Sequence, residues 1–162
     1  MVQSGSIKYT PAVENLFRSV ESVINLLYVN AEQKSIKLKN EIDKNAAAWA
    51  DKDMIDIIFR NLISNAIKFT QIDGEVRISS KNIDEFVEIK VSDTGVGIDK
   101  EKQKRLFNLN TPITTQGTQN ESGSGLGLNL CKELIIKHGG SIRIESNVGK
   151  GTSIFFTLRK PQ

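Results

Sequence analysis

Three polar side chains that could bind a metal ion and phosphate share one flank of a predicted helix. Apolar spacing and a capping Asp51 predict this helix up to about Phe69. At about 100° per residue, Asn61, Asn65 and Lys68 fall within an arc of about 60°. An amide oxygen suits a magnesium ion that keeps its waters and phosphate oxygens, and lysine suits phosphate. The flank could also be the ordinary solvated face of an amphipathic helix. Its apolar neighbours are Ile55, Ile58, Phe59, Leu62 and Ala66.

An aspartate ends a predicted buried strand and is followed by glycines. Strand alternation puts Asp93 on the apolar face of residues 85–93. A buried carboxylate needs a donor, because leaving it unpaired costs on the order of several kcal/mol. A purine exocyclic amine could be that donor, and Gly95 and Gly97 would let the backbone pass close to a flat ligand. Alternatively, Asp93 bonds its own backbone in a turn. The apolar residues of this face are Val87, Ile89 and Val91.

The triplet Asp93-Thr94-Gly95 also begins the signature of aspartic proteases. Such an enzyme needs two aspartates that share a site. The sequence contains Asp-Thr-Gly once, so a protease would have to be a homodimer, and the following Val96-Gly97 departs from the signature. This function is therefore disfavoured.

A third, glycine-rich segment, residues 123–127, opens a predicted helix that ends at His138-Gly139-Gly140. Free N–H groups at a helix start attract anions, and glycines let a polyphosphate approach closely. Rossmann and Walker interpretations fail, since the glycines follow a polar loop instead of a strand and no Gly-Lys-Ser/Thr follows them. Residues 149–152 lie in a predicted hairpin, so they are not a Walker motif either.

These groups lie far apart in the sequence, so a mixed arrangement of helices and strands must bring them together. Residues 108–125 are mostly Thr, Asn, Gln, Ser and Gly, which predicts a lid or binding loop. The order of elements predicts a sheet covered on one face by helices. The predicted helices cover 11–33, 51–69, 100–107 and about 125–138. The predicted strands cover 36–42, 47–50, 74–81, 85–93, 142–146 and 152–158, with a hairpin turn near 83–85.

Composition excludes several other classes of protein. The chain has 162 residues, 38% apolar and 25% charged, which is typical of one globular domain. A single cysteine, Cys131, and a single histidine, His138, exclude intrachain disulfides and Cys- or His-rich metal sites. The net charge of +3 is too balanced to argue for nucleic acid. The single cysteine fits a reducing, cytoplasmic setting, and we find neither a membrane span nor a signal-peptide pattern.

Taken together and in order, these blocks resemble the ATP-binding catalytic domain of sensor histidine kinases. Gyrase, mismatch-repair and heat-shock-chaperone ATPases share this Bergerat-type fold. The resemblance covers residues 7–160, with the ATP lid at about 99–124, and makes residues 1–6 the tail of a preceding helical dimerisation domain. It implies an α+β fold, a two-layer α/β sandwich. A mixed, mostly antiparallel sheet of about five strands would be covered on one face by about three helices.

The resemblance also implies roles for individual residues. Asn65 would ligate Mg²⁺, Asn61 would support the ion through phosphate or water, and Lys68 would hold phosphate. Asp93 would accept a hydrogen bond from the adenine amine of ATP. The other implied nucleotide contacts are Gly95, Gly97, Ile98, Phe107, Gly123, Gly125, Leu126, Gly127 and Thr152.

The sequence departs from the family pattern in two places. Hydrolytic relatives have a glutamate base where this chain has Asn61, so transfer to an external acceptor is favoured over hydrolysis. Kinases of the family often carry a basic residue in the lid, whereas residues 107–127 contain none. Lys102, Lys104 or Arg105 are candidates to replace it.

By the resemblance, the partners are a dimerisation domain that carries the acceptor histidine and a downstream response regulator. No contact with nucleic acid or membrane is implied for this domain, although the parent protein can be membrane-anchored. His138 has no carboxylate neighbour to take its proton, so we expect it to be structural. The alternative function is a nucleotide-dependent binding module of the pseudokinase or anti-sigma type. An acceptor histidine upstream of the chain would distinguish the two.

Overall fold

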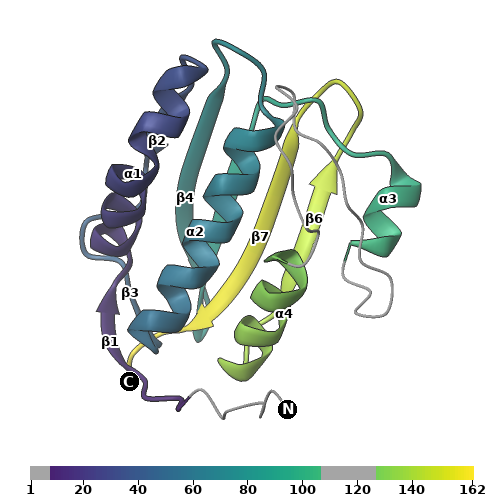
Figure 1. Ribbon diagram of the computed structural model, residues 1–162. Helices are drawn as coiled ribbons and strands as arrows, with labels where there is room; N and C mark the ends of the chain where they lie inside the picture. The colour runs from purple at the N-terminus through teal and green to yellow at the C-terminus, as the bar shows by residue number, and fades with distance from the viewer. Residues whose placement is uncertain (1–7, 107–126) are drawn as a thin grey trace, which may run out of the picture.

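The protein forms two layers, with helices packed on one face of a sheet. The computed structural model describes residues 8–106 and 127–162. Figure 1 shows the three longer helices side by side in front of the sheet, with a short helix apart from them. The predicted α+β sandwich is confirmed. The helices are α1 (Leu16–Gln33), α2 (Lys52–Phe69), α3 (Lys100–Arg105) and α4 (Gly127–Lys137).

The main sheet has five strands in the order β2-β4-β5-β7-β6. Its β2 and β4 are parallel, and every other neighbouring pair in it is antiparallel. A separate two-stranded sheet pairs β1 with β3. The strands are β1 (Ala12–Asn15), β2 (Lys37–Asn40), β3 (Ala47–Ala50), β4 (Glu75–Ile83), β5 (Phe86–Asp93), β6 (Ile142–Ser146) and β7 (Thr152–Arg159).

The first predicted helix starts too early, because residues 12–15 form strand β1. The side chain of Asn15 caps α1 by accepting a hydrogen bond from the Arg18 amide at 2.9 Å. Upstream of this cap, Val13 pairs with Trp49 of β3. The apolar Val13 fits both a helical and a strand periodicity, and the pairing with β3 decides between them.

The core lies between the helices and the inner face of the sheet. Helix α2 is central, and its predicted apolar stripe is buried. The Phe59 ring meets the Phe156 ring of β7 edge-on, with 5.7 Å between centroids. This packing fixes the rotation of α2, so the flank beside the stripe points in a defined direction.

His138 joins the end of α4 to the start of α2. It is only 2% exposed, and its Nε2 accepts a hydrogen bond from the Asp51 amide at 3.1 Å. Its Nδ1 lies 2.7 Å from the Leu134 carbonyl oxygen, which makes Nδ1 the protonated nitrogen of a neutral ring. The Tyr9 ring packs edge-on at 5.0 Å. His138 therefore has the structural environment expected from the sequence.

No helix in the described parts of the chain is long and apolar enough to span a membrane.

Gly139 ends α4 with a φ of 73°, and the Gly140 amide donates to the Ile135 carbonyl at 3.0 Å. The helix thus ends at the predicted glycines in a left-handed cap.

Candidate functional site

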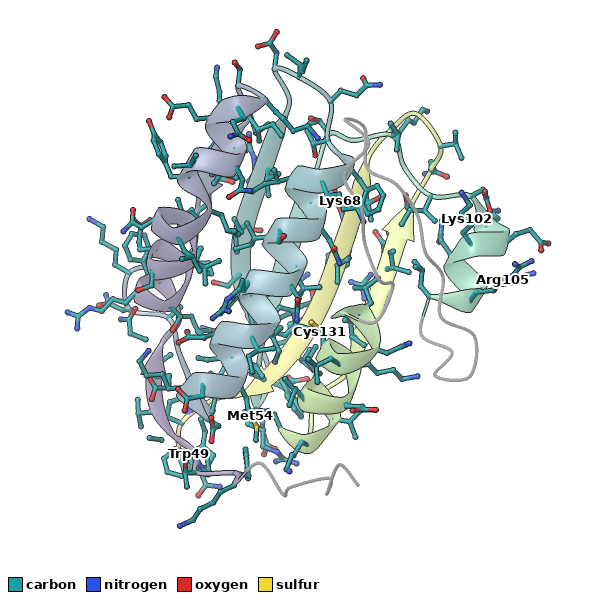
Figure 2. The ribbon with its side chains drawn as sticks, in the orientation of Figure 1. Trp49, Met54, Lys68, Lys102, Arg105 and Cys131 are labelled. Atoms are coloured by element: carbon teal, nitrogen blue, oxygen red, sulfur yellow. The ribbon has the colours of Figure 1, made fainter. Side chains whose placement is uncertain are left out.

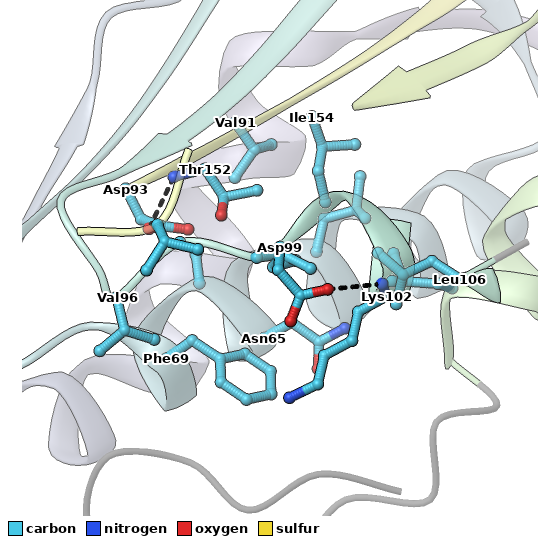
Figure 3. Close-up of a pocket in the computed structure, with 16 residues that line it drawn as sticks. Asn65, Phe69, Val91, Asp93, Val96, Asp99, Lys102, Leu106, Thr152 and Ile154 are labelled. Carbon is cyan, nitrogen blue, oxygen red and sulfur yellow. Dashed lines mark hydrogen bonds between the residues drawn. The ribbon is translucent and has the colours of Figure 1, made fainter. Parts of the chain in front are cut away.

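A cavity of about 330 Å³ opens where β5 ends, between α2, α3 and the β6–β7 turn (Figure 3). Its size suits a small-molecule ligand. Apolar side chains form most of its wall, and the polar groups come from separate elements. The lining residues are Leu62, Asn65, Ala66, Phe69, Val91, Asp93, Val96, Gly97, Ile98, Asp99, Lys102, Leu106, Leu128, Val148, Thr152 and Ile154.

Asp93 is positioned by two backbone amides. Its Oδ1 accepts hydrogen bonds from the Gly95 amide at 2.8 Å and the Thr152 amide at 3.2 Å. Both bonds use the same oxygen, so Oδ2 is available to a donor in the cavity. Burial raises the pKa of Asp93 to about 6, and the two amide bonds oppose that shift only in part. The turn, one of the two alternatives that the sequence left open, is present, and it uses only one of the two carboxylate oxygens.

The glycines after Asp93 make room for protein backbone. A Cβ on Gly95 would lie 2.3 Å from the Phe69 carbonyl oxygen, at the end of α2. Gly97 has a φ of 75°, and a Cβ there would lie 2.0 Å from the Asn147 carbonyl oxygen. Gly97 lines the cavity and Gly95 does not. The glycines let the loop pack between α2 and the β6–β7 turn, which shapes the cavity floor.

The three polar residues on the flank of α2 are half-buried and have different surroundings. Asn65 lines the cavity. Asn61, about one turn earlier, faces α4: its side chain hydrogen-bonds to Cys131, and a Cβ on Gly127 would lie 3.4 Å from its Oδ1. Lys68 places its ammonium 4.9 Å from the centre of the Phe69 ring. The structure therefore brings Asn65 into the cavity lining, whereas Asn61 and Lys68 are not part of that lining.

Thr152 and Ile98 are held by one serine at the end of β6. The Ser146 hydroxyl accepts from the Ile98 amide at 2.8 Å and lies 2.8 Å from the Thr152 hydroxyl. Gly151, with a φ of 82°, precedes Thr152, and a Cβ on it would lie 2.1 Å from the Asp93 carbonyl oxygen. This close approach lets the Thr152 amide reach Asp93.

Other lining residues were not among the predicted nucleotide contacts, although Lys102 was one of three candidates to replace a basic lid residue. Phe69 and Leu62 are on the same helix as Asn65, and their helical spacing could have indicated them. Asp99 and Lys102 lie at the start of α3, where the Asp99 carboxylate accepts from the Lys102 amide at 2.8 Å. The predicted contacts Phe107, Gly123, Gly125 and Leu126 lie outside the described residues.

The cation-binding capacity of the site is limited. Among the described residues, no group of three or more His, Cys, Asp or Glu side chains could hold a metal ion. The Asn65 amide lines the cavity, and within the described chain no hydrogen bond joins it to another residue. An ion bound here would need further oxygen ligands from a ligand or water, which is the usual situation for Mg²⁺ with a nucleotide.

Comparison with known proteins places this geometry in context. The family described as "Histidine kinase-, DNA gyrase B-, and HSP90-like ATPase" matches residues 50–162. The chain is 38% identical over 128 residues to the adaptive-response sensory kinase SasA of Crocosphaera subtropica. That match covers 78% of this chain and 33% of the relative, so the chain spans about a third of its length.

Solved structures agree with the fold. The catalytic domain of histidine kinase ThkA superposes with a TM-score of 0.80 at 28% identity, covering 93% of this chain and 96% of that one. ThkA has also been solved in complex with the response regulator TrrA (TM-score 0.76, 26% identity, 94% and 42% coverage). Full-length ShkA in complex with AMPPNP superposes with a TM-score of 0.78 at 26% identity, covering 94% of this chain and 31% of that chain.

Proposed function

Because this chain belongs to the family of histidine kinase-, DNA gyrase B- and HSP90-like ATPases, we propose that it binds Mg-ATP and supplies the γ-phosphate to a histidine on a separate domain. It would act as the catalytic domain of a two-component sensor kinase. The domain would span residues 7–160, with the lid at about 99–124 and residues 1–6 as the tail of a helical dimerisation domain.

The observation that carries the proposal is the carboxylate of Asp93 in the wall of a largely apolar cavity. Its Oδ1 is occupied by the Gly95 and Thr152 amides, which leaves Oδ2 for one strong donor. Apolar walls such as Val91 and Ile154 suit the faces of a purine. If position 6 of the purine faces Asp93, the 6-amino group of adenine donates to the carboxylate and the 6-keto group of guanine does not, so this orientation favours adenine over guanine.

The phosphate end would lie toward α2 and the start of α4. Asn65 would give Mg²⁺ one protein oxygen, and Asn61 and Lys68 would contact phosphate oxygens or bound water. When bound, the ion neutralises phosphate charge and polarises the transferring group. Gly127 begins α4, and phosphate binding by residues 123–127, including Gly123, Gly125 and Leu126, would use the amides at this helix start. Gly95, Gly97, Ile98 and Thr152 would shape the base site, and Phe107 would be a further nucleotide contact.

Transfer to an external acceptor is favoured over hydrolysis. An amide such as that of Asn61 has no useful proton affinity near neutral pH, so it cannot activate a water molecule as a general base. His138 cannot receive the phosphoryl group in this fold, since both ring nitrogens have partners and the residue is buried. The acceptor would be a histidine of the parent kinase, and the product would pass to a response regulator. We place this domain in the cytoplasm.

Titration calorimetry of the wild-type chain with a non-hydrolysable ATP analogue and with the matching GTP analogue tests the proposal. We expect binding of the ATP analogue in the presence of Mg²⁺ and at least about tenfold weaker binding of the GTP analogue, since an unpaired polar group costs about 1–3 kcal/mol. Asp93→Asn should remove most of this preference. Equal binding of both nucleotides by the wild type would refute Asp93 as the group that reads the base.

A further inference from the structure

The charge of the cavity lining does not match the ligand proposed for it. Its ionisable members are two aspartates, Asp93 and Asp99, and one lysine, Lys102. A nucleotide triphosphate would add several negative charges, and like charges a few ångströms apart repel strongly in a partly buried site. Among the described residues that line the cavity, Lys102 has the only basic side chain. The Lys102 ammonium is therefore the group in this lining that could offset the negative charge of a bound nucleotide.

Helix α3 holds the backbone of Lys102 in a fixed place. The Lys102 amide donates to the Asp99 carboxylate at 2.8 Å, which caps the helix. The Gln103 side-chain amide donates to the Ile98 carbonyl at 2.7 Å and to the Ser146 carbonyl at 2.9 Å. These bonds tie α3 to the loop after β5 and to the end of β6. With the backbone held in this way, the position of the Lys102 ammonium is set by the conformation of its side chain.

Neighbouring basic residues do not share this position. Lys100, Lys104 and Arg105 belong to the same short helix and are absent from the cavity lining. In Figure 3 the Lys102 side chain extends from α3 toward the side of the cavity where Asn65 and Phe69 lie. Asp99 uses its Oδ1 for the helix cap, and within the described residues no ion pair joins a carboxylate to the Lys102 ammonium. The charge is thus available to a ligand.

We propose that Lys102 binds the phosphate chain of the nucleotide, reaching from α3 toward the side of the cavity where Asn65 of α2 lies. This inference rests on the proposed function and adds a phosphate-binding residue at the start of the proposed lid. An ammonium on a flexible stem is a compact charge that can follow phosphate oxygens without a fixed fork geometry. Asp99 has a positioning role, because it sets the start of α3 and therefore the origin of the Lys102 side chain.

The test compares Lys102→Ala, Lys102→Arg and a matched control, Lys104→Ala, in the complete chain. Calorimetric affinities are measured for adenosine, ADP and a non-hydrolysable ATP analogue with Mg²⁺, at low and at moderate salt. We expect Lys102→Ala to weaken the ATP analogue about five- to tenfold and to leave adenosine within about twofold. Lys102→Arg should restore most of the loss. The salt dependence of ATP-analogue binding should be smaller in Lys102→Ala, since one screened attraction is missing.

Three results would overturn the inference. In the first, Lys102→Ala binds the ATP analogue as tightly as the wild type. In the second, Lys102→Ala and Lys104→Ala weaken binding equally, which would indicate general surface charge. In the third, adenosine and the ATP analogue weaken together, which would place Lys102 at the base or in the fold. A wild-type chain that binds none of the three ligands would refute the proposed function itself, so the two failures are distinguishable.

Discussion

At the residue scale, Asp93 lowers the stability of the ligand-free fold while it provides the acceptor for a ligand. Its folded-state pKa is about 6, above its ordinary value of 3.8, because burial penalises the charged form. The folded protein therefore binds a proton more tightly than the unfolded chain. Stability from this group is present at low pH and is lost as pH rises from about 4 to above 6.

Asp93→Asn should therefore stabilise the ligand-free protein at pH 8. An amide keeps an oxygen for the Gly95 and Thr152 amides and carries no charge to desolvate. A shift of about two pKa units corresponds to roughly 2–3 kcal/mol, so we expect the melting temperature to rise by several degrees. Scanning calorimetry at pH 8 and pH 4.5 measures this, and the gain should shrink at pH 4.5. Asp84→Asn, in the exposed β4–β5 turn, is the control, and an equal gain there would contradict the explanation.

The same carboxyl should make nucleotide binding depend on pH. Below about pH 6 the protonated acid can no longer accept a hydrogen bond at both oxygens, so affinity for the ATP analogue should fall as pH drops from 7.5 to 5. Titrations across this range check the effect, and Asp93→Asn should show a flatter profile. A wild-type affinity that is constant over the range would show that Asp93 does not bind the ligand in its ionised form.

At the element scale, α2 combines a buried stripe with a ligand-facing flank, and Asn65 is the flank residue that reaches the cavity. We predict that Asn65→Ala keeps some nucleotide binding and loses the enhancement by Mg²⁺, because the protein offers the ion few other oxygens. For each protein, the nucleotide affinity measured with Mg²⁺ is divided by the affinity measured with a chelator, and this ratio gives the enhancement by Mg²⁺. Ser64→Ala, on the exposed side of α2, is the matched control. If Mg²⁺ strengthens nucleotide binding equally in wild type and Asn65→Ala, a group other than Asn65 binds the Mg²⁺ ion.

The contact between α4 and α2 depends on His138. We predict that His138→Ala lowers the free energy of unfolding by about 2–4 kcal/mol, because it leaves the Asp51 amide unpaired and opens a small cavity. Urea denaturation measures this value. Ile136→Ala, which removes a 58% exposed side chain from the same helix, should cost much less. Equal losses in the two variants would mean that the His138 hydrogen bonds contribute nothing specific.

Local periodicity was sufficient for the elements that contact the core along their whole length. The 3.6-residue spacing of Ile55, Ile58 and Leu62 predicted α2 and the direction of its polar flank. The two-residue alternation of β5 predicted that Asp93 faces inward. The start of α1 was wrong because Val13 pairs with Trp49, a residue 36 positions away that no local pattern includes.

At the scale of the whole molecule, the cavity depends on contacts between distant segments. Lys102 could not be chosen over Lys104 or Arg105 from the sequence, because its orientation depends on the Gln103 bond to Ser146, 43 residues later. The bond from Thr152 to Asp93 spans 59 residues and is equally invisible to local patterns. Figure 2 shows Lys68 on α2 and Lys102 on α3, two separate elements of the fold. The order of the motifs predicted which segments of the chain meet at the cavity. Tertiary packing determines which atoms of those segments are in contact.

The central claim is that this domain holds ATP for transfer to a histidine outside it. Phosphoryl transfer relies on positioning and charge stabilisation, so a missing in-line nucleophile prevents the reaction even when ATP is well bound. The most direct measurement incubates the chain with γ-labelled Mg-ATP, alone and with a separate dimerisation domain that carries an acceptor histidine. We predict slow phosphate release and no acid-labile label on the chain alone, and label on the added domain alone. Label on this chain that disappears in His138→Ala would contradict the account.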